Sequence, residues 1–474
     1  MTTLVFVHGW SVTNTSTYGE LPTRVQQRAA AAGLGLTIAD LWLSEYVSFD
    51  DTVTMGDLVR GFDHALRDLH LLDSRFACVA HSTGGPVVRE WLRAQRERPG
   101  AHSTIRLSHL IMLAPANFGS ALAQLGKGSL GKLKSWLNHV EPGQRILDWL
   151  ELGSAESLSL NLDHIHGGDP AAHGQFQFVL TGDRPDRALY DHINSYTGED
   201  GSDGVIRVAA ANLNARHAVL TRNSADTLAL NVTQAPRSAF KLIPGASHSG
   251  DTSGIMTAGA DHTVDSIVRC LRISDATGYA ALCNDFDKEN AARNQEPVEL
   301  EPVGPFSPRV HIHDPRSLLI VRLTDEADEP LVDSRFLLEA GTPPNPDWMP
   351  QGFMLDRQAN SRARHVISMF LNHALLAGSE RIADPRDGRK TLRTAVQAHR
   401  PYSVNMQPAD LTGLVHHAAA NMRQGDDLMD VLGPHQTTVL DVVMPRKVRE
   451  GIFRLTQVLT PRDFREPTAG SVIP

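Results

Sequence analysis

The sequence contains little cysteine: its 474 residues include three, Cys78, Cys270 and Cys283. An odd and small number excludes a disulfide framework, and none of the three forms a CxxC pair or stands beside histidines at a metal-binding spacing. We therefore expect free thiols in a reducing environment, and the cysteines predict no metal site.

Long apolar runs are also missing. No segment approaches the ~18 consecutive apolar residues of a transmembrane helix. The first apolar run, residues 4–7, is too short for the core of a signal peptide and has no basic flank. Any membrane contact is therefore expected to be peripheral.

Positive charge is not in excess, because 45 Lys and Arg residues stand against 54 Asp and Glu residues. The resulting net charge of −9 gives no general attraction to nucleic acid. A composition of 41% hydrophobic and 21% charged residues is typical of globular proteins and excludes a disordered chain or a fibre. The length allows two or three domains.

Predicted strands and helices alternate through the first part of the chain. Buried strands are expected at 4–7, 34–42, 75–80, 105–114, 176–180 and 239–243, and helices at 20–32, 55–69, 87–98 and 262–271. This alternation indicates βαβ units and a mostly parallel sheet with helices on both faces. We predict an α/β domain over residues 1–285.

The alternation is interrupted between about residues 117 and 165, where apolar residues recur at helical spacing. We predict a lid-like insertion of two or more amphipathic helices. Trp136 and Trp149 stand near lysines, which suits an interface between water and lipid. It is equally open that they pack onto the body of the protein or form a subunit contact.

The C-terminal part differs in pattern. Residues 286–308 are charged, contain proline and lack periodicity, which is typical of a linker. Residues 309–474 contain short β-prone runs between turn residues and one helix-like stretch at 363–376. They predict a mainly antiparallel, β-sandwich-like domain without a catalytic pattern. Its apolar residues form its own core or, in our hypothesis, mediate membrane contact and oligomer assembly.

The sharpest local signal surrounds Ser82. A predicted strand is followed by His81-Ser82-Thr83-Gly84-Gly85 and then by a predicted helix, which is the nucleophile elbow of α/β-hydrolases. Ala80 replaces the usual first glycine, but it is the next smallest residue. A serine hydroxyl is a weak nucleophile, so it must face a histidine base on one side and oxyanion donors on the other.

Two backbone N–H groups are predicted to form the oxyanion hole. One belongs to Thr83, the residue after the nucleophile. The second donor in this fold comes from the loop after an earlier strand, where His8-Gly9-Trp10 follows residues 4–7. We therefore expect the N–H groups of Trp10 and Thr83 to converge on the developing alkoxide.

The base is expected on the loop after the last strand, since the chain order in this fold is serine, acid, histidine. His248 meets this description. Its rival, His262, opens the predicted final helix and is expected to cap or pack it.

The acid has more than one candidate. Asp203 lies in Ser202-Asp203-Gly204-Val205, a pattern like the acid motif of many bacterial lipases, and its role would be to orient the imidazole and stabilise its cation. Asp183 directly follows the predicted strand at 176–180 and is the alternative acid. Asp200 and Asp183 otherwise serve as structural or turn-forming carboxylates.

Three other motif matches are weak. Residues 126–131 fit GxGxxG but lack the preceding strand of a dinucleotide site, and residues 129–132 fit SxxK without its companion motifs. The acidic loop at 199–203 fits a solvated turn better than a calcium site. We therefore predict no cofactor and no metal.

A family resemblance combines these features. The elbow at 80–85, the segment 114–120, the loop around Asp203 and the β-rich C-terminal part together resemble the PlaB-type bacterial phospholipases A. The resemblance covers nearly the whole chain. It implies Ser82, Asp203 and His248 as the triad, phospholipids and lysophospholipids as substrates, no cofactor, and homo-oligomers. It further implies a bacterial protein without a signal peptide, peripherally associated with a membrane and otherwise cytoplasmic.

Two other functions stay open at this point. A carboxylesterase or thioesterase acting on a water-soluble acyl compound would use the same triad. A hydrolase-fold scaffold without catalytic activity, whose β domain binds a partner, belongs to another class altogether. Covalent labelling of Ser82 by a fluorophosphonate would dispose of the scaffold.

Overall fold

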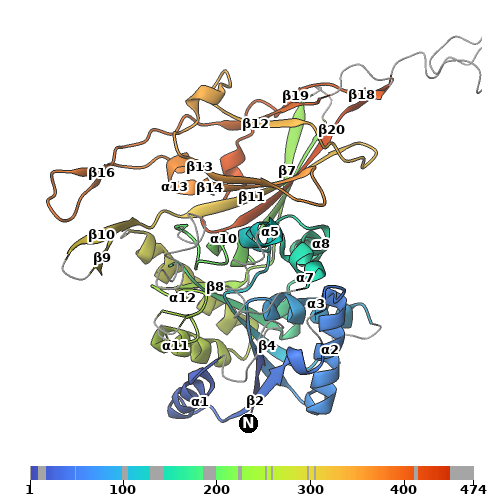
Figure 1. Ribbon diagram of the computed structural model, residues 1–474, viewed down its shortest axis with the longest axis vertical. Coiled ribbons are helices and arrows are strands. Elements are labelled where there is room, and N and C mark those ends of the chain that lie inside the picture. Colours follow the sequence, from blue (N-terminus) through green and yellow to red (C-terminus); the bar gives the residue numbers. More distant parts are fainter. Residues whose placement is uncertain are drawn as a thin grey trace, which may run out of the picture.

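The computed structural model describes residues 2–8, 18–47, 50–98, 105–128, 143–184, 199–222, 227–250, 253–257, 260–295, 298–303, 306–409 and 415–448. Two parts are stacked along the long axis of the molecule (Figure 1). The lower part in that view contains most of the N-terminal half of the chain, and the upper part consists mainly of strands.

The lower part is built on a six-stranded sheet in the order β2-β1-β3-β4-β5-β8. Its strands are β1 (Thr2–His8), β2 (Leu36–Trp42), β3 (Phe76–His81), β4 (Leu107–Leu113), β5 (Phe176–Gly182) and β8 (Ala239–Ile243). All five pairings are parallel. The predicted α/β-hydrolase architecture is confirmed, and every predicted strand of the sheet is present.

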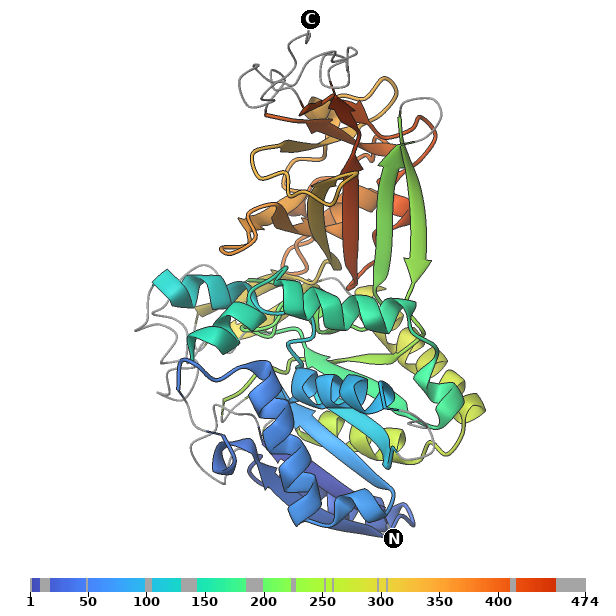
Figure 2. The same ribbon diagram turned by 90° about the vertical axis from the view of Figure 1, so that its right-hand side faces the viewer.

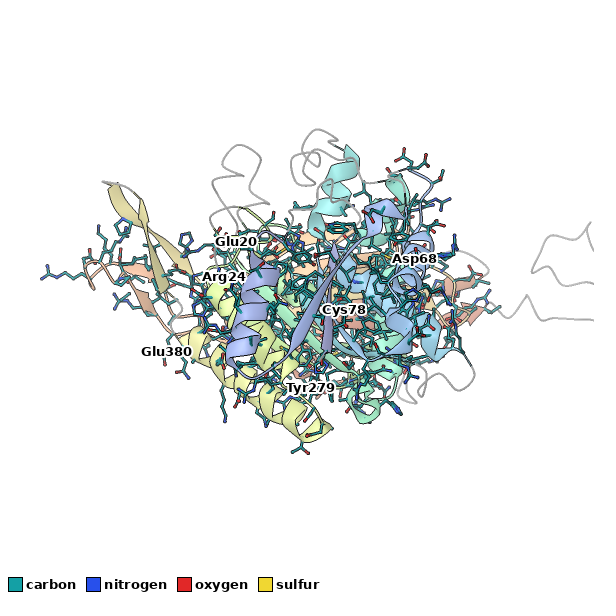
Figure 3. The ribbon with its side chains drawn as sticks, turned by 90° about the horizontal axis from the view of Figure 1, so that it is seen from below. Glu20, Arg24, Asp68, Cys78, Tyr279 and Glu380 are labelled. Carbon is teal, nitrogen blue, oxygen red and sulfur yellow. The ribbon has the colours of Figure 1, made fainter. Side chains whose placement is uncertain are left out.

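Helices cover both faces of this sheet. The helices are α1 (Leu21–Ala31), α11 (Ala260–Leu271) and α12 (Ala276–Gln295) on one face, and α2 (Met55–Asp68) and α3 (Gly84–Arg96) on the other. Seen from below, Glu20, the N-cap of α1, and Tyr279 of α12 lie to one side of Cys78 in the sheet, and Asp68 of α2 lies to the other (Figure 3). The three cysteines are free and buried.

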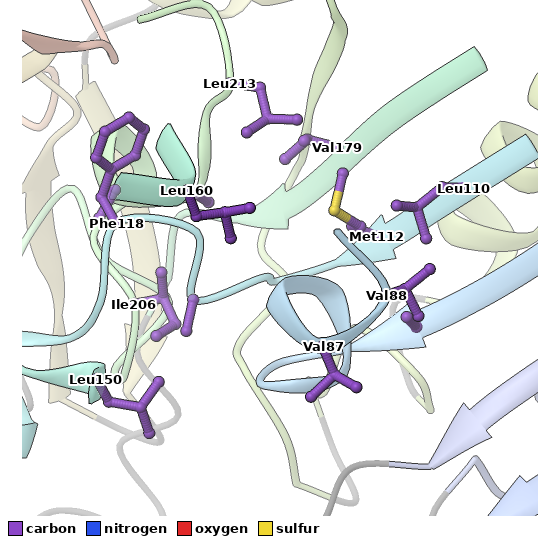
Figure 4. Packing of buried hydrophobic residues seen from close by; sticks show 14 of the residues in the cluster. Val87, Val88, Leu110, Met112, Phe118, Leu150, Leu160, Val179, Ile206 and Leu213 are labelled. Atoms are coloured by element: carbon purple, nitrogen blue, oxygen red, sulfur yellow. The ribbon is translucent and has the colours of Figure 1, made fainter. Parts of the chain in front are cut away.

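Each face of the parallel sheet has its own apolar core, because side chains along a strand alternate between the two faces. In β1, Val5 and Val7 face α2 and α3, whereas Leu4 and Phe6 face α1 and α11. Since successive strand side chains point to opposite faces, a strand covered on both sides is a continuous apolar run. This is why the strands could be predicted. Figure 4 shows the first core, where Val87 and Val88 of α3 pack near residues of β4.

The predicted insertion contains α5 (Ala121–Gly128), α7 (Gln144–Leu150) and α8 (Ala155–His166). These helices lie between the two parts of the molecule (Figure 2). Trp149 is buried in the core, so for this residue the packed interpretation holds. Trp136 and residues 129–132 lie outside the described residues, and the start of the GxGxxG match belongs to α5.

The upper part contains a second six-stranded sheet in the order β13-β14-β11-β20-β6-β7. Its strands are β13 (Met354–Ala359), β14 (Val366–Asn372), β11 (Arg316–Asp325), β20 (Thr437–Met444), β6 (Arg216–Arg222) and β7 (Leu228–Gln234). The pairing is mainly antiparallel, as expected, except at the centre of this sheet, where β20 pairs in parallel with both β11 and β6. β6 and β7 come from the N-terminal half of the chain, which the sequence patterns did not indicate.

A three-stranded sheet of β12 (Arg335–Ala340), β17 (Tyr402–Gln407) and β19 (Ala420–Asn421) packs on the second large sheet. Apolar residues from both sheets form one core between them, including Leu319, Val321, Phe336 and Val404. The C-terminal region is therefore rich in β-structure, as predicted.

The remaining elements are short. They are α10 (Val208–Ala211), α13 (His373–Ala377), β9 (Val298–Val303), β10 (Phe306–Ile312), β15 (Ile382–Ala383), β16 (Thr391–Arg393), β18 (Val415–His417) and β21 (Arg446–Val448). β9 and β10 form one hairpin, and β15 and β16 form another. Within the described residues, no helix has both the length and the apolar character that a membrane span requires.

Two expected segments differ from the structure. Residues 286–308 are not free of regular structure, since they contain the end of α12, β9 and the start of β10. Residues 363–376 hold β14 followed by the single turn of α13, not one helix. The predicted domain boundaries at residues 285 and 309 stay a proposal. β6 and β7 precede residue 285 but belong to the sheet of the upper part.

Candidate active site

Ser82 stands at the sharp turn between β3 and α3. Its φ of 54° is in the left-handed region, which is strained for a residue with a side chain and typical of a nucleophile elbow. The Ser82 N–H donates to the carbonyl oxygen of Leu113 on β4, at 3.0 Å. A Cβ on Gly85 would come within 2.9 Å of Cβ of Pro115, so glycine permits this close turn.

His248 lies on the loop after β8, and its Nε2 is 3.1 Å from Oγ of Ser82. Its backbone N–H donates to the carbonyl oxygen of Asp203 at 2.9 Å. The side chain is buried. A loop after the last strand therefore reaches back 166 residues to the serine.

Asp203 completes a hydrogen-bonded chain. Its Oδ2 is 2.9 Å from Nδ1 of His248. Its Oδ1 accepts the N–H groups of Val205 at 3.0 Å and Ile206 at 2.7 Å. The residue is fully buried. This division of its oxygens fits the tautomer in which Nδ1–H donates to Asp203 and Nε2 accepts from the Ser82 hydroxyl.

His81 is a neighbour of this chain that the sequence patterns did not single out. Its Nε2 is 3.0 Å from the carbonyl oxygen of His248, and the centroids of the two imidazole rings are 4.7 Å apart. The residue is buried. Its position directly before Ser82 is the only signal that could have indicated it.

The structure places the rival residues elsewhere. Oδ2 of Asp183 accepts from Nε of Arg293 at 2.6 Å, which ties β5 to α12. His262 is exposed on α11, where its carbonyl oxygen accepts from Ser266. Neither residue meets Ser82, and Asp200 lies in the turn before the Asp203 loop.

One of the two expected oxyanion donors can be located. Thr83 is the N-cap residue of α3, and the N–H groups at the start of a helix have no partner within the helix. Trp10 lies outside the described residues.

The acidic loop before Asp203 is held by an arginine. Glu199 accepts from Nε of Arg207 at 2.9 Å and from its Nη2 at 3.0 Å. Burial alone would lower the pKa of Arg207, but the carboxylates of Glu199 and Asp356 outweigh this and raise it. No group of three or more ligand-type side chains in the described part of the chain could hold a metal ion.

The solved structures that match over nearly the full chain include two of phospholipase PlaB. Phospholipase PlaB from Legionella pneumophila in complex with thio-NAD is 35% identical, with 99% of each chain covered and a TM-score of 0.82. Another structure of phospholipase PlaB from Legionella pneumophila is 36% identical, with 98% of this chain and 97% of that chain covered and a TM-score of 0.83. No family model and no curated protein matches the sequence.

The parallel sheet, the strained turn at Ser82 and the loop order define an α/β-hydrolase. The identity of 35–36% over almost the whole chain goes further. The chain belongs to the PlaB phospholipase family and is an ester hydrolase.

Proposed function

We propose that this protein hydrolyses fatty-acyl ester bonds of glycerophospholipids and lysophospholipids through an acyl-enzyme on Ser82. The observation that carries the proposal is the hydrogen-bonded chain from Ser82 through His248 to Asp203. Family membership supports phospholipids as the substrate class.

In the proposed reaction, Oγ of Ser82 attacks the ester carbonyl carbon while Nε2 of His248 takes the hydroxyl proton. Asp203 holds the imidazole in position and stabilises the imidazolium without taking the proton. The tetrahedral intermediate then collapses, the C–O bond to the glycerol oxygen breaks, and His248 protonates that oxygen. Water then attacks the carbonyl carbon of the acyl-enzyme while His248 takes its proton. The bond to Oγ of Ser82 breaks, His248 returns the proton to that oxygen, and the fatty acid is released.

We further propose that the oxyanion of the intermediate accepts hydrogen bonds from the backbone N–H groups of Trp10 and Thr83. Thr83 is the N-cap of α3, where the backbone N–H has no partner within the helix, and this supports Thr83 as a donor. One such donor contributes roughly 3 kcal/mol to the transition state. Every step uses side chains and backbone N–H groups of this chain together with water, so we propose no cofactor for the hydrolysis.

We also propose where the enzyme acts and how it assembles. Phospholipid substrates are held in membranes or micelles, so we propose peripheral membrane contact of a bacterial protein that is otherwise cytoplasmic. We propose self-association into homo-oligomers, with the C-terminal β-rich region contributing to both. A truncation after about residue 300 that kept activity, size and liposome binding would contradict that role of the region.

Ser82→Ala tests the central claim. It removes the nucleophilic oxygen and leaves the fold, because the side chain is small and only partly buried. We expect fatty-acid release from phospholipid vesicles, resolved by head group, to fall to background while the thermal unfolding midpoint stays unchanged. An active Ser82→Ala protein would overturn the assignment of the nucleophile.

The substrate class needs its own comparison. Phospholipid vesicles, lysophospholipid micelles and short-chain nitrophenyl esters are to be assayed side by side with the same enzyme. An enzyme that acts on lipid aggregates is expected to prefer the vesicles and micelles. A clear preference for the dissolved esters would favour a soluble carboxylesterase or thioesterase instead.

A further inference from the structure

The loop that carries Asp203 is short and closed at its base. Ser202 and Arg207 form an isolated bridge, and the N–H of Val208 donates to the carbonyl oxygen of Gly201 at 3.0 Å. The N–H of Ile206, which binds Oδ1 of Asp203, is separated from Arg207 by one peptide bond. Any displacement of Arg207 therefore moves a donor that fixes the Asp203 carboxylate.

Arg207 is buried between the two parts of the molecule. Its side chain is 2% exposed, and it contacts carboxylates from two directions. Glu199, before the loop, receives two hydrogen bonds, and Asp356 of β13 receives one from Nη2 at 2.6 Å. The guanidinium carbon lies 4.3 Å from the ring centroid of Phe370 on β14. Two of these three contacts come from the upper sheet.

The loop lies directly on the upper sheet. A Cβ on Gly201 would come within 2.6 Å of Cγ of Arg316 on β11. The carbonyl oxygen of Ala209, just after the loop, accepts from Oγ1 of Thr437 on β20 at 2.8 Å. The loop therefore has little room to shift while these contacts hold.

We propose that Arg207, held by Asp356 and Phe370 of the upper sheet, is a positioning residue that fixes the Asp203 carboxylate against His248. This inference rests on the proposed role of Asp203 in catalysis. It assigns the β-rich region a part in ester hydrolysis itself, beyond membrane contact or assembly. Arg207 touches neither substrate nor reacting atoms and acts through the loop.

Asp356→Asn tests the inference because it removes the charge and keeps the shape of the side chain. The change leaves Glu199 as the remaining carboxylate partner of Arg207, which weakens the tie between the loop and the upper sheet. A displacement of about 1 Å in a catalytic group can cost up to 10²-fold in rate. We therefore expect kcat for a short-chain nitrophenyl ester to fall by about 10-fold to 100-fold with KM within about twofold, and Asp356→Glu to restore most of kcat.

Asp441→Asn is the matched control. Asp441 of β20 also binds an arginine of the same sheet, since its Oδ1 accepts from Nε of Arg322 at 2.5 Å. Within the described residues its side chain binds Arg322 and His217 and not the Asp203 loop. We expect this variant to keep kcat. An equal loss of kcat in Asp356→Asn and Asp441→Asn would reduce the effect to general destabilisation and overturn the inference.

The coupling to Asp203 is tested by a double variant. If Asp356 acts through Asp203, adding Asp356→Asn to Asp203→Asn lowers kcat no further. Additive losses would overturn the inference, and so would a folded Asp356→Asn protein with unchanged kcat. Should Asp356→Asn fail to fold, Phe370→Leu takes its place, with the same expected fall in kcat and the same contradiction if kcat is unchanged.

Different experiments test the proposed function and the positioning role of Arg207. If Ser82→Ala keeps its activity, the acyl-enzyme mechanism is wrong whatever Asp356→Asn does. If Ser82→Ala is inactive and Asp356→Asn keeps the kcat of the unmodified chain, only the positioning role is wrong.

Discussion

At the scale of single residues, the meeting of Ser82 and His248 depends on a close approach between two backbones. Gly182 ends β5, and a Cβ at this position would lie 1.9 Å from the carbonyl oxygen of Ala246. Ala246 stands two residues before His248 on the same loop. The missing side chain of Gly182 therefore lets the histidine loop approach the carboxyl edge of the sheet.

Gly182→Ala is expected to push this loop outward. The overlap is with backbone, which cannot rotate away, so the free energy of unfolding should fall by about 1–3 kcal/mol. Because the loop carries His248, kcat should fall as well. Chemical denaturation and nitrophenyl ester hydrolysis measure both effects.

Gly168→Ala is the control for this prediction, since a Cβ on Gly168 meets nothing within 4 Å. It should leave stability and kcat close to those of the unmodified chain. Equal stability and kcat in the Gly182→Ala and Gly168→Ala proteins would contradict the steric argument.

At the scale of elements, a buried arginine joins the helix after Ser82 to the insertion. Arg89 of α3 donates to Oδ1 of Asn117 at 3.1 Å and to Oδ1 of Asn161 on α8 at 3.0 Å. Burial lowers the pKa of Arg89 to about 9. Asn161 in turn donates to the carbonyl oxygen of Asn117 at 2.7 Å. The insertion is thus fixed to α3 by a network of buried polar groups.

Asn161→Leu is expected to break this network. The change keeps the branched shape of the side chain but leaves the Arg89 guanidinium and the Asn117 carbonyl short of partners. Loss of partners for a buried charged group costs about 3 kcal/mol or more in the free energy of unfolding. Denaturant titration measures the loss.

Ser159→Ala, on the exposed side of the same helix, should change the free energy of unfolding by no more than about 0.5 kcal/mol. The prediction for Asn161→Leu would be wrong if the two variants were equally stable.

Elements also differ in how far the sequence indicates them. The strand β14 is buried along its whole length, so its apolar residues are continuous and carry no period of two. A run of this kind also fits a buried helix, which is why the pattern at 363–376 predicts one. The sequence patterns do not indicate β6 and β7. β7 is an edge strand whose last four residues are exposed, so no continuous buried run marks it.

At the scale of the whole molecule, the two parts share a core. In β11, Leu318 and Ile320 pack into the core that contains α2 and α3, whereas Leu319 and Val321 pack into the core of the upper part. A Cβ on Gly153, between α7 and α8, would come within 2.6 Å of Cγ1 of Val366 on β14. The upper sheet therefore serves as a packing surface for the hydrolase part.

Two buried histidines lie in this shared structure and make stability depend on pH. Burial lowers the pKa of His164 to about 3 and the pKa of His435 to about 3. His435 reaches α12, with Nε2 3.3 Å from Oδ1 of Asn294. In the unfolded chain both would take up a proton near pH 6.5. As pH falls from about 6.5 towards about 3, the unfolded state binds more protons and stability is lost.

We expect each histidine to remove up to about 1.4 kcal/mol per unit of pH within that window. Thermal unfolding between pH 7 and pH 5 measures the effect. His435→Asn tests it, since asparagine tolerates the φ of 56° at this position. Its unfolding midpoint should fall less over this range than that of the unmodified chain. An identical fall in both proteins would contradict the assignment to His435.

The sequence by itself determined the local features of this protein. Buried parallel strands are continuous apolar runs, and an elbow needs small residues around its serine, so the sheet, Ser82 and the candidates Asp203 and His248 could be predicted from short segments. Only the tertiary structure decided that Asp203 and not Asp183 meets His248. It also decided that strands from both halves of the chain share one sheet that supports the Asp203 loop. These contacts join residues at least 45 positions apart, and no local pattern of side chains encodes such a pairing.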